Sequence, residues 1–153
     1  MRYAEILLNY AEAKIEMGTI DQSVLDAMNA IRQRPGVDMP VITTMDQDEL
    51  RKLVTRERKI ELAGEGLRLS DIRRWGIAEK ALDGTLVGRP VKEYYDNPPV
   101  PQIDEDGIPD YTDHLELFRV IEPRNFNPAR DYLSPIPQRE IDINKNLEQN
   151  PGY

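Results

Sequence analysis

Apolar residues recur every three or four positions along the first part of the chain, which is the period of an amphipathic helix. The first such segment is Arg2–Met17, and it is followed by Gly18, a residue that can end a helix in the left-handed conformation. A helix over this segment is therefore predicted. The apolar positions expected to form its buried stripe are Tyr3, Ile6, Leu7, Tyr10, Ala13 and Met17.

A second helical pattern follows a capping signal at Asp21, or at Thr19 with Gln22, and ends at Pro35-Gly36. The expected apolar stripe of this helix consists of Val24, Leu25, Met28 and Ile31. From residue 3 to residue 36 the two helices span 34 positions, which is the period of a tetratricopeptide helical hairpin. The sequence thus predicts a helical hairpin over residues 1–36.

A single hairpin of this kind cannot bury its own apolar face. We therefore expect the chain by itself either to dimerise through residues 2–17 or to leave Tyr3, Leu7 and Tyr10 partly exposed.

Residues 46–82 predict a helix-turn-helix motif and contain the most highly charged stretch of the chain, residues 56–76. Asp46 with Glu49 can cap the first helix, and Gly64 and Gly66 can end it. On a helical wheel its apolar face also carries two carboxylates, and the face consists of Leu50, Leu53, Val54, Glu57, Ile60 and Glu61.

Two interpretations of these carboxylates are open. A carboxylate on a buried face is costly unless it is paired, so Glu57 or Glu61 is expected to contact an arginine from residues 68–74. The charge network expected on this interpretation consists of Glu57, Arg58, Glu61, Arg68, Asp71 and Arg74. On the other interpretation, Glu57 and Glu61 are the acid and base of an active site, such as that of a glycoside hydrolase.

The helical period stops at Leu82, which ends a short helical segment from Ile77. Residues 83–131 contain seven prolines and predict a long irregular loop insertion. Residues 132–153 predict an extended tail with one short helical turn at 138–143, because prolines exclude helix before it. The predicted fold class is all-α, with tetratricopeptide-like helical hairpins, a long loop insertion and an extended C-terminal tail.

The composition excludes several classes of function. The chain has 153 residues and a formal net charge of −8, which argues against nucleic-acid binding. It has no cysteine and a single histidine, so a disulfide framework, a histidine-rich metal site and a Ser-His-Asp triad are not expected. No apolar run is long enough to span a bilayer, and no cofactor is expected.

Aromatic and amide side chains in the loop insertion have the chemistry of sugar binding, in which rings stack on pyranoses and polar groups bind hydroxyls. The candidate ligand-binding residues are Tyr94, Tyr95, Asp96, Asn97 and Tyr111, with Phe126 nearby in sequence. The alternative is that these rings anchor the loop to the core. Trp75 is expected to belong to the core rather than to a sugar platform.

Residues 102–113 partly match the twelve-residue calcium loop of an EF-hand, with acidic residues and Gly107 at matching positions. The first position is Gln102 rather than aspartate, and the prolines before it preclude an entering helix. A solvated acidic turn is therefore expected here, and no metal site is predicted.

Three stretches together resemble the SusD/RagB family of surface glycan-binding lipoproteins: residues 2–13 (RYAEILLNYAEA), residues 56–76 (RERKIELAGEGLRLSDIRRWG) and residues 132–153 (YLSPIPQREIDINKNLEQNPGY). The central stretch matches the family pattern ER-x-x-EL-x-x-EG-x-R-x-x-D-[LI]-x-RW at Glu57, Arg58, Glu61, Leu62, Glu65, Gly66, Arg68, Asp71, Ile72, Arg74 and Trp75.

The resemblance implies a non-catalytic, glycan- or nutrient-binding component of an outer-membrane uptake complex. The implied partners are a SusC-type TonB-dependent transporter and an oligosaccharide or other nutrient. It also implies a surface-exposed lipoprotein whose lipidated cysteine is absent from this chain, so the chain is expected to be the C-terminal part of such a protein. The alternative function is a tetratricopeptide-like scaffold for protein–protein contact without its own ligand site.

Overall fold

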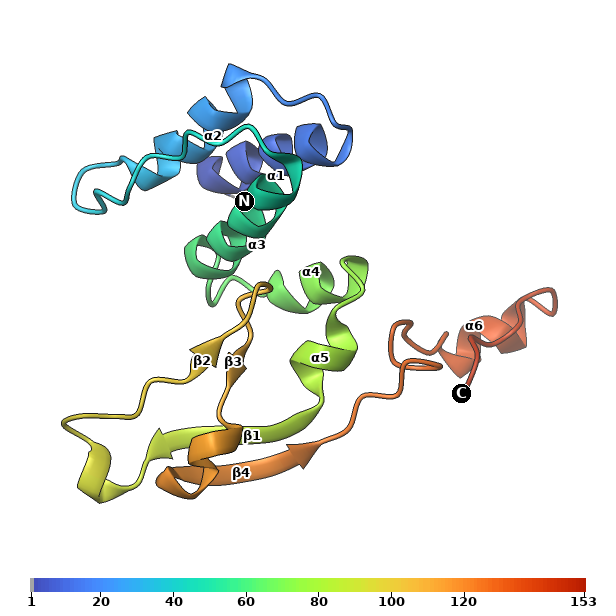
Figure 1. Ribbon diagram of the computed structural model, residues 1–153. Helices are drawn as coiled ribbons and strands as arrows, with labels where there is room; N and C mark the ends of the chain where they lie inside the picture. Colours follow the sequence, from blue (N-terminus) through green and yellow to red (C-terminus); the bar gives the residue numbers. More distant parts are fainter. Residues whose placement is uncertain (1) are drawn as a thin grey trace. The chain divides into compact units, whose positions relative to one another are not determined.

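The computed structural model describes residues 2–153, which divide into two compact units (Figure 1). The first unit runs up to Arg68 and includes Ile103–Gly107. The second unit comprises Leu69–Gln102 and Ile108–Tyr153. Long helices form most of the first unit, whereas the second combines short helices with strands. Within the described part of the chain, every helix is too short or too polar to cross a bilayer.

Three helices build the first unit: α1 (Tyr3–Glu16), α2 (Gln22–Arg32) and α3 (Gln47–Glu61). Helix α1 packs against both α2 and α3 (Figure 1). The predicted caps form at α2 and α3, where Asp21 accepts a hydrogen bond from the Ser23 amide at 3.0 Å and Asp46 accepts one from Glu49 at 2.9 Å. The three helices confirm the positions predicted from periodicity.

The buried face of α1 differs from the predicted one. Tyr3, Tyr10 and Met17 are 75%, 43% and 73% exposed, although they were expected to form the buried stripe. Periodicity gives the spacing of apolar positions, but α1 has apolar residues on more than one side, so packing against α2 and α3 decides which side is buried. The expectation of partly exposed tyrosines on this helix is confirmed. The fully buried residues of α1 are Leu8, Ala11 and Ile15.

The core of the first unit joins this face of α1 to α2, α3 and the linker between them. In α3, Leu50 and Val54 are buried as predicted, but Ile60 is 63% exposed, which corrects the predicted face. The buried core consists of Leu8, Ala11, Ile15, Val24, Leu25, Ala27, Met28, Ile31, Ile42, Leu50, Val54 and Leu62. The chain leaves α3 through Gly64 and Gly66, whose φ angles of 79° and 78° favour glycine.

Residues 83–131 contain strands, which corrects the predicted irregular loop and the strictly all-α fold class. Strand β1 (Gly84–Pro90) pairs antiparallel with β4 (Phe118–Arg124), and the register is interrupted on either side of Val87. The partner strands are far apart in sequence, so no tight-turn signal marks their pairing. Along the chain, four shorter elements separate β1 from β4: η1 (Lys92–Tyr94), β2 (Gln102–Ile103), β3 (Pro109–Asp110) and η2 (Thr112–Leu117). Strand β3 pairs with β2.

The helices of the second unit are α4 (Arg68–Arg74), which begins at the boundary, α5 (Ala78–Leu82) and α6 (Gln138–Ile143). A small core forms from Ile72, Ala78 and Phe126, and the rings of Phe126 and Tyr132 pack edge-to-face with their centroids 5.0 Å apart. Trp75, which was expected in the core, is half-buried and is not part of this core, and the Arg74 guanidinium lies 4.8 Å from its ring centroid. The short helix predicted at 138–143 is confirmed by α6.

Gln149 holds the C-terminal segment through two hydrogen bonds to one residue. Its Oε1 accepts from the Ile136 amide at 2.8 Å, and its Nε2 donates to the Ile136 carbonyl at 2.9 Å. Replacing Gln149 with leucine leaves both backbone groups without these partners, so the Ile136 amide is expected to exchange about ten-fold faster or more. Hydrogen exchange measured by mass spectrometry or NMR checks this, with Glu148→Leu as the exposed control. Unchanged protection of Ile136 would contradict it.

Candidate functional site

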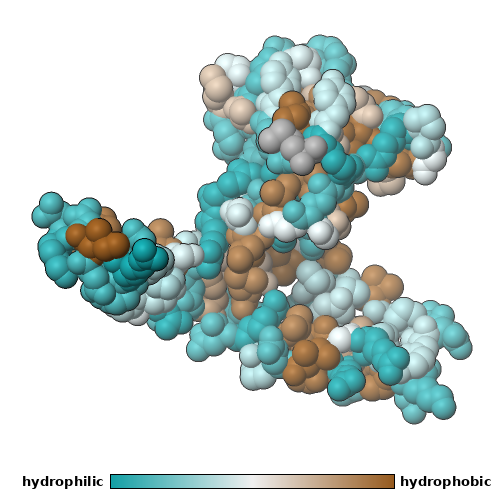
Figure 2. All heavy atoms as spheres, turned by 180° about the vertical axis from the view of Figure 1, so that it is seen from behind, coloured by the Kyte–Doolittle hydropathy of each residue, from teal (hydrophilic) through white to brown (hydrophobic). Residues whose placement is uncertain are grey.

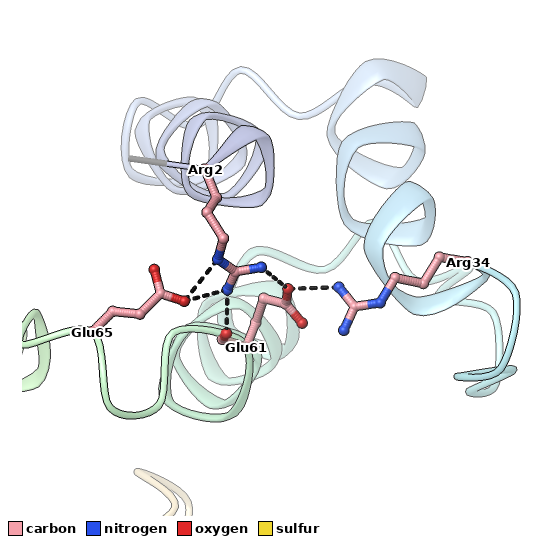
Figure 3. Close-up of polar contacts among 4 residues, drawn as sticks. All are labelled: Arg2, Arg34, Glu61 and Glu65. Carbon is pink, nitrogen blue, oxygen red and sulfur yellow. Dashed lines mark hydrogen bonds and ion pairs between the residues drawn. The ribbon is translucent and has the colours of Figure 1, made fainter.

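The two glutamates in the last turns of α3 are buried and paired with arginines. Glu57 Oε2 lies 2.7 Å from Arg32 Nη1, and these side chains are 10% and 12% exposed. The Glu61 carboxylate contacts Arg34 Nη1 at 2.5 Å and Arg2 Nη1 at 2.9 Å (Figure 3). Pairing with arginine is as predicted, but the predicted source of the arginines, residues 68–74, is wrong. The partners come from the residue before α1 and from the last residue of α2 and its following turn.

Arg2 makes further contacts at the C-terminal end of α3. Its Nη2 donates to the Glu61 backbone carbonyl at 2.6 Å, and its Nε donates to Glu65 Oε1 at 2.7 Å (Figure 3). A cation at this end of a helix is favourable because the last carbonyls have no partner within the helix. One guanidinium therefore joins the start of α1 to the end of α3.

The remaining members of the predicted charge network lie in separate clusters. Arg58 is buried on α3, where its Nη1 donates to Asn9 Oδ1 at 2.6 Å and its Nε lies 3.4 Å from Glu12 Oε2. Asp71 pairs with Arg74 at 2.8 Å within α4. Arg68 is the first residue of that helix. Of the residues predicted as one network, Glu57, Arg58, Glu61, Asp71 and Arg74 each take part in an ion pair.

The electrostatics of Glu61 do not suit an acid catalyst. The hydrogen bond from Arg34 lowers the pKa of the Glu61 carboxyl below its usual range, and Arg2 acts in the same direction. A general acid in a glycoside hydrolase needs a raised pKa. With Glu57 also paired to Arg32, the arrangement favours the ion-pair interpretation over an active site.

The acidic turn at residues 103–107 is held against α3 by two lysines. Lys59 Nζ donates to the Gly107 carbonyl, and Lys52 Nζ lies 2.8 Å from Glu105 Oε2. Burial lowers the pKa of Lys59. Across residues 2–153, no group of three or more histidine, aspartate or glutamate residues has a metal-binding arrangement. In place of the helices of an EF-hand, the short strands β2 and β3 flank this turn.

The candidate tyrosines fall into two environments in the second unit. Tyr94 and Tyr95, at the end of η1, are 38% and 45% exposed, and the exposed Asp96 and Asn97 follow them directly. Tyr111 is half-buried and packs edge-to-face on Phe118, with ring centroids 4.8 Å apart. The Tyr111 ring thus packs against another ring, whereas Tyr94 and Tyr95 are exposed residues.

Local hydrogen bonds position this exposed pair at the end of the β1–β4 ribbon. The Val91 amide donates to the Leu117 carbonyl at 2.8 Å, and the Tyr94 amide donates to the Val91 carbonyl at 2.9 Å. The Arg89 guanidinium lies 5.1 Å from the centroid of the Tyr95 ring. Sequence reasoning missed Arg89, because the contact with Tyr95 depends on how the chain turns after β1, which no periodic pattern in these residues indicates.

Comparison with known proteins identifies the family. The model of the SusD family matches residues 1–153, and the chain therefore belongs to this family. SusD-like protein P2 of Formosa agariphila is 31% identical over 163 residues, which cover 100% of this chain and 25% of that protein. The chain thus spans about a quarter of the length of this relative.

Solved structures of the same family have the same fold. A SusD-like carbohydrate binding protein from Bacteroides fragilis is 38% identical with a TM-score of 0.76, over 97% of this chain and 28% of that one. A second SusD-like protein from Bacteroides fragilis is 36% identical with a TM-score of 0.69, over 100% of this chain and 25% of that one. The resemblance found in the sequence is therefore confirmed.

Proposed function

We propose that this chain is part of a non-catalytic carbohydrate-binding protein of an outer-membrane uptake complex. Its partner in this proposal is a SusC-type TonB-dependent transporter, and the intact protein is a surface lipoprotein. Membership of the SusD family supports the proposal, as does a similar structure described as a carbohydrate binding protein. The paired carboxylates of α3 give no support to a hydrolase.

The ligand-binding residues proposed within this chain are Tyr94, Tyr95, Asp96 and Asn97. Tyr111, whose ring packs on Phe118, is proposed as a further member of the site. The observation that carries this assignment is the exposure of two adjacent tyrosine rings on a segment braced by prolines. Such rings can stack on the apolar face of a sugar, and neighbouring carboxylate and amide groups can bind its hydroxyls. Prolines nearby reduce the entropy lost when the segment is held in one shape.

Replacing Tyr95 with alanine in the intact protein is expected to weaken glycan binding by about 1–3 kcal/mol, because a stacking contact and its apolar area are lost. Affinity gel electrophoresis against a panel of neutral and acidic polysaccharides finds the ligand, and calorimetry then measures the change. The melting temperature should stay near that of the unchanged protein, since Tyr95 is 45% exposed.

Tyr3→Ala is the matched control, because Tyr3 is an exposed tyrosine on α1, in the other unit. It should leave glycan binding unchanged. Unchanged binding combined with lower stability in Tyr95→Ala would instead assign Tyr95 as an anchor of its segment.

The alternative function, a scaffold for protein contact alone, is supported by the exposed apolar side of α1. Tyr3, Ile6 and Tyr10 lie on this side at helical spacing and are each at least 43% exposed. Figure 2 shows hydrophobic residues at the surface of the protein, among hydrophilic ones. Absence of binding to every polysaccharide of the panel, with retention of a transporter partner in pull-down, would favour the scaffold.

A further inference from the structure

Arg89 and Arg119 are guanidinium groups with no carboxylate partner within residues 2–153. The Arg89 guanidinium lies over the Tyr95 ring, 5.1 Å from its centroid. Other arginines of this acidic chain, which has a net charge of −8, do pair with carboxylates. Arginines that pair with carboxylates are Arg2, Arg32, Arg34, Arg51, Arg58, Arg74 and Arg130.

The register of the β1–β4 ribbon places the backbone of Arg89 level with that of Arg119. Val87 is opposite Val120 and Pro90 is opposite Phe118, so Arg89 lies between these pairs, at the level of Arg119. Gly88 allows the close approach of β4, since a methyl group there would lie 2.9 Å from Ile121 Cδ1 and 3.4 Å from the Arg119 carbonyl. Like charges on neighbouring strands repel one another, and a bound anion would remove this cost.

We propose that Arg89, whose guanidinium lies over the ring of the exposed Tyr95, and Arg119, level with it on β4, bind an anionic substituent of the carbohydrate ligand, either a carboxylate or a sulfate. A guanidinium laid over an aromatic ring keeps its N–H donors at the edge of its own plane, where they can form paired hydrogen bonds to such a group. The adjacent rings of Tyr94 and Tyr95 then contact the sugar itself. This inference rests on the proposed function and adds the class of ligand.

The test uses the intact protein and polysaccharide pairs that differ in charge. Polygalacturonate is compared with its carboxyl-reduced form, and dextran sulfate with dextran, by affinity electrophoresis and calorimetry. At least one charged member is expected to bind about ten-fold more tightly than its neutral counterpart, and Arg89→Met/Arg119→Met should abolish this preference. The pair that shows the preference distinguishes a carboxylate from a sulfate ligand.

Arg139→Met is the control, because Arg139 is an exposed arginine on α6 with no ion-pair partner in residues 2–153. It removes the same charge and should keep the preference. Retention of the preference in the double variant overturns the inference. The inference is also overturned if each neutral polysaccharide binds as tightly as its charged counterpart, or if only neutral glycans bind. Either result leaves the proposed function standing. Failure to bind any charged or neutral polysaccharide counts against the proposed function itself.

Discussion

Replacing Arg32 with methionine is expected to lower the free energy of unfolding by about 3–5 kcal/mol, because the substitution leaves a buried carboxylate without its opposite charge. Glu57 is buried, and Arg32 Nη1 lies 2.7 Å from its Oε2. Arg32 Nε also donates to the Pro40 carbonyl at 3.0 Å, so the variant loses a contact to the linker as well. Urea denaturation followed by circular dichroism measures the change.

The double variant Arg32→Met/Glu57→Leu is expected to recover most of this loss. Both charges are then absent, so no uncompensated charge remains in the protein interior. Arg51→Met is the matched control, since Arg51 pairs with Glu16 at 2.7 Å but is 42% exposed. Exposed ion pairs contribute less than about 1 kcal/mol. If Arg32→Met were no more destabilising than Arg51→Met, the buried pair would contribute no more than a surface pair.

Replacing Leu50 with alanine is expected to cost about 2–5 kcal/mol of unfolding free energy, because the lost methyl groups leave a cavity that the neighbouring helices only partly fill. Leu50 is 0% exposed and belongs to the core shared by α1, α2 and α3. The substitution keeps helix propensity, since alanine favours helix. The loss is therefore a measure of packing and is read from the urea midpoint at constant slope.

Ile60→Ala is the control on the same helix. Ile60 is 63% exposed, so its truncation is expected to change the unfolding free energy by less than about 0.5 kcal/mol. The two variants together test which face of α3 is buried. A loss at Ile60 comparable to that at Leu50 would restore the face predicted from the helical wheel.

The sequence by itself determined the local features of this protein. The helices of the first unit, the caps at Asp21 and Asp46, and the end of α3 before Gly64 follow from periodicity, from capping side chains and from the freedom of glycine. These signals work because each depends on residues within a few positions of one another. The order of three motifs was sufficient to indicate the family, which comparison confirmed.

Contacts between residues far apart in the chain were decided only by the tertiary structure. A wheel gives the spacing of apolar positions on α1, but α2 and α3 determine that Leu8 rather than Tyr3 is buried. The sequence indicates that the Glu61 carboxylate needs a cationic partner, which any of twenty lysines and arginines could supply. In the structure the partners are Arg2 and Arg34, because the start of α1 and the end of α2 lie close to the end of α3. The pairing of β1 with β4 also leaves no local signal in the sequence, because the paired residues are far apart in the chain. Bringing them together costs loop-closure entropy, and contacts made in the folded protein compensate for that cost.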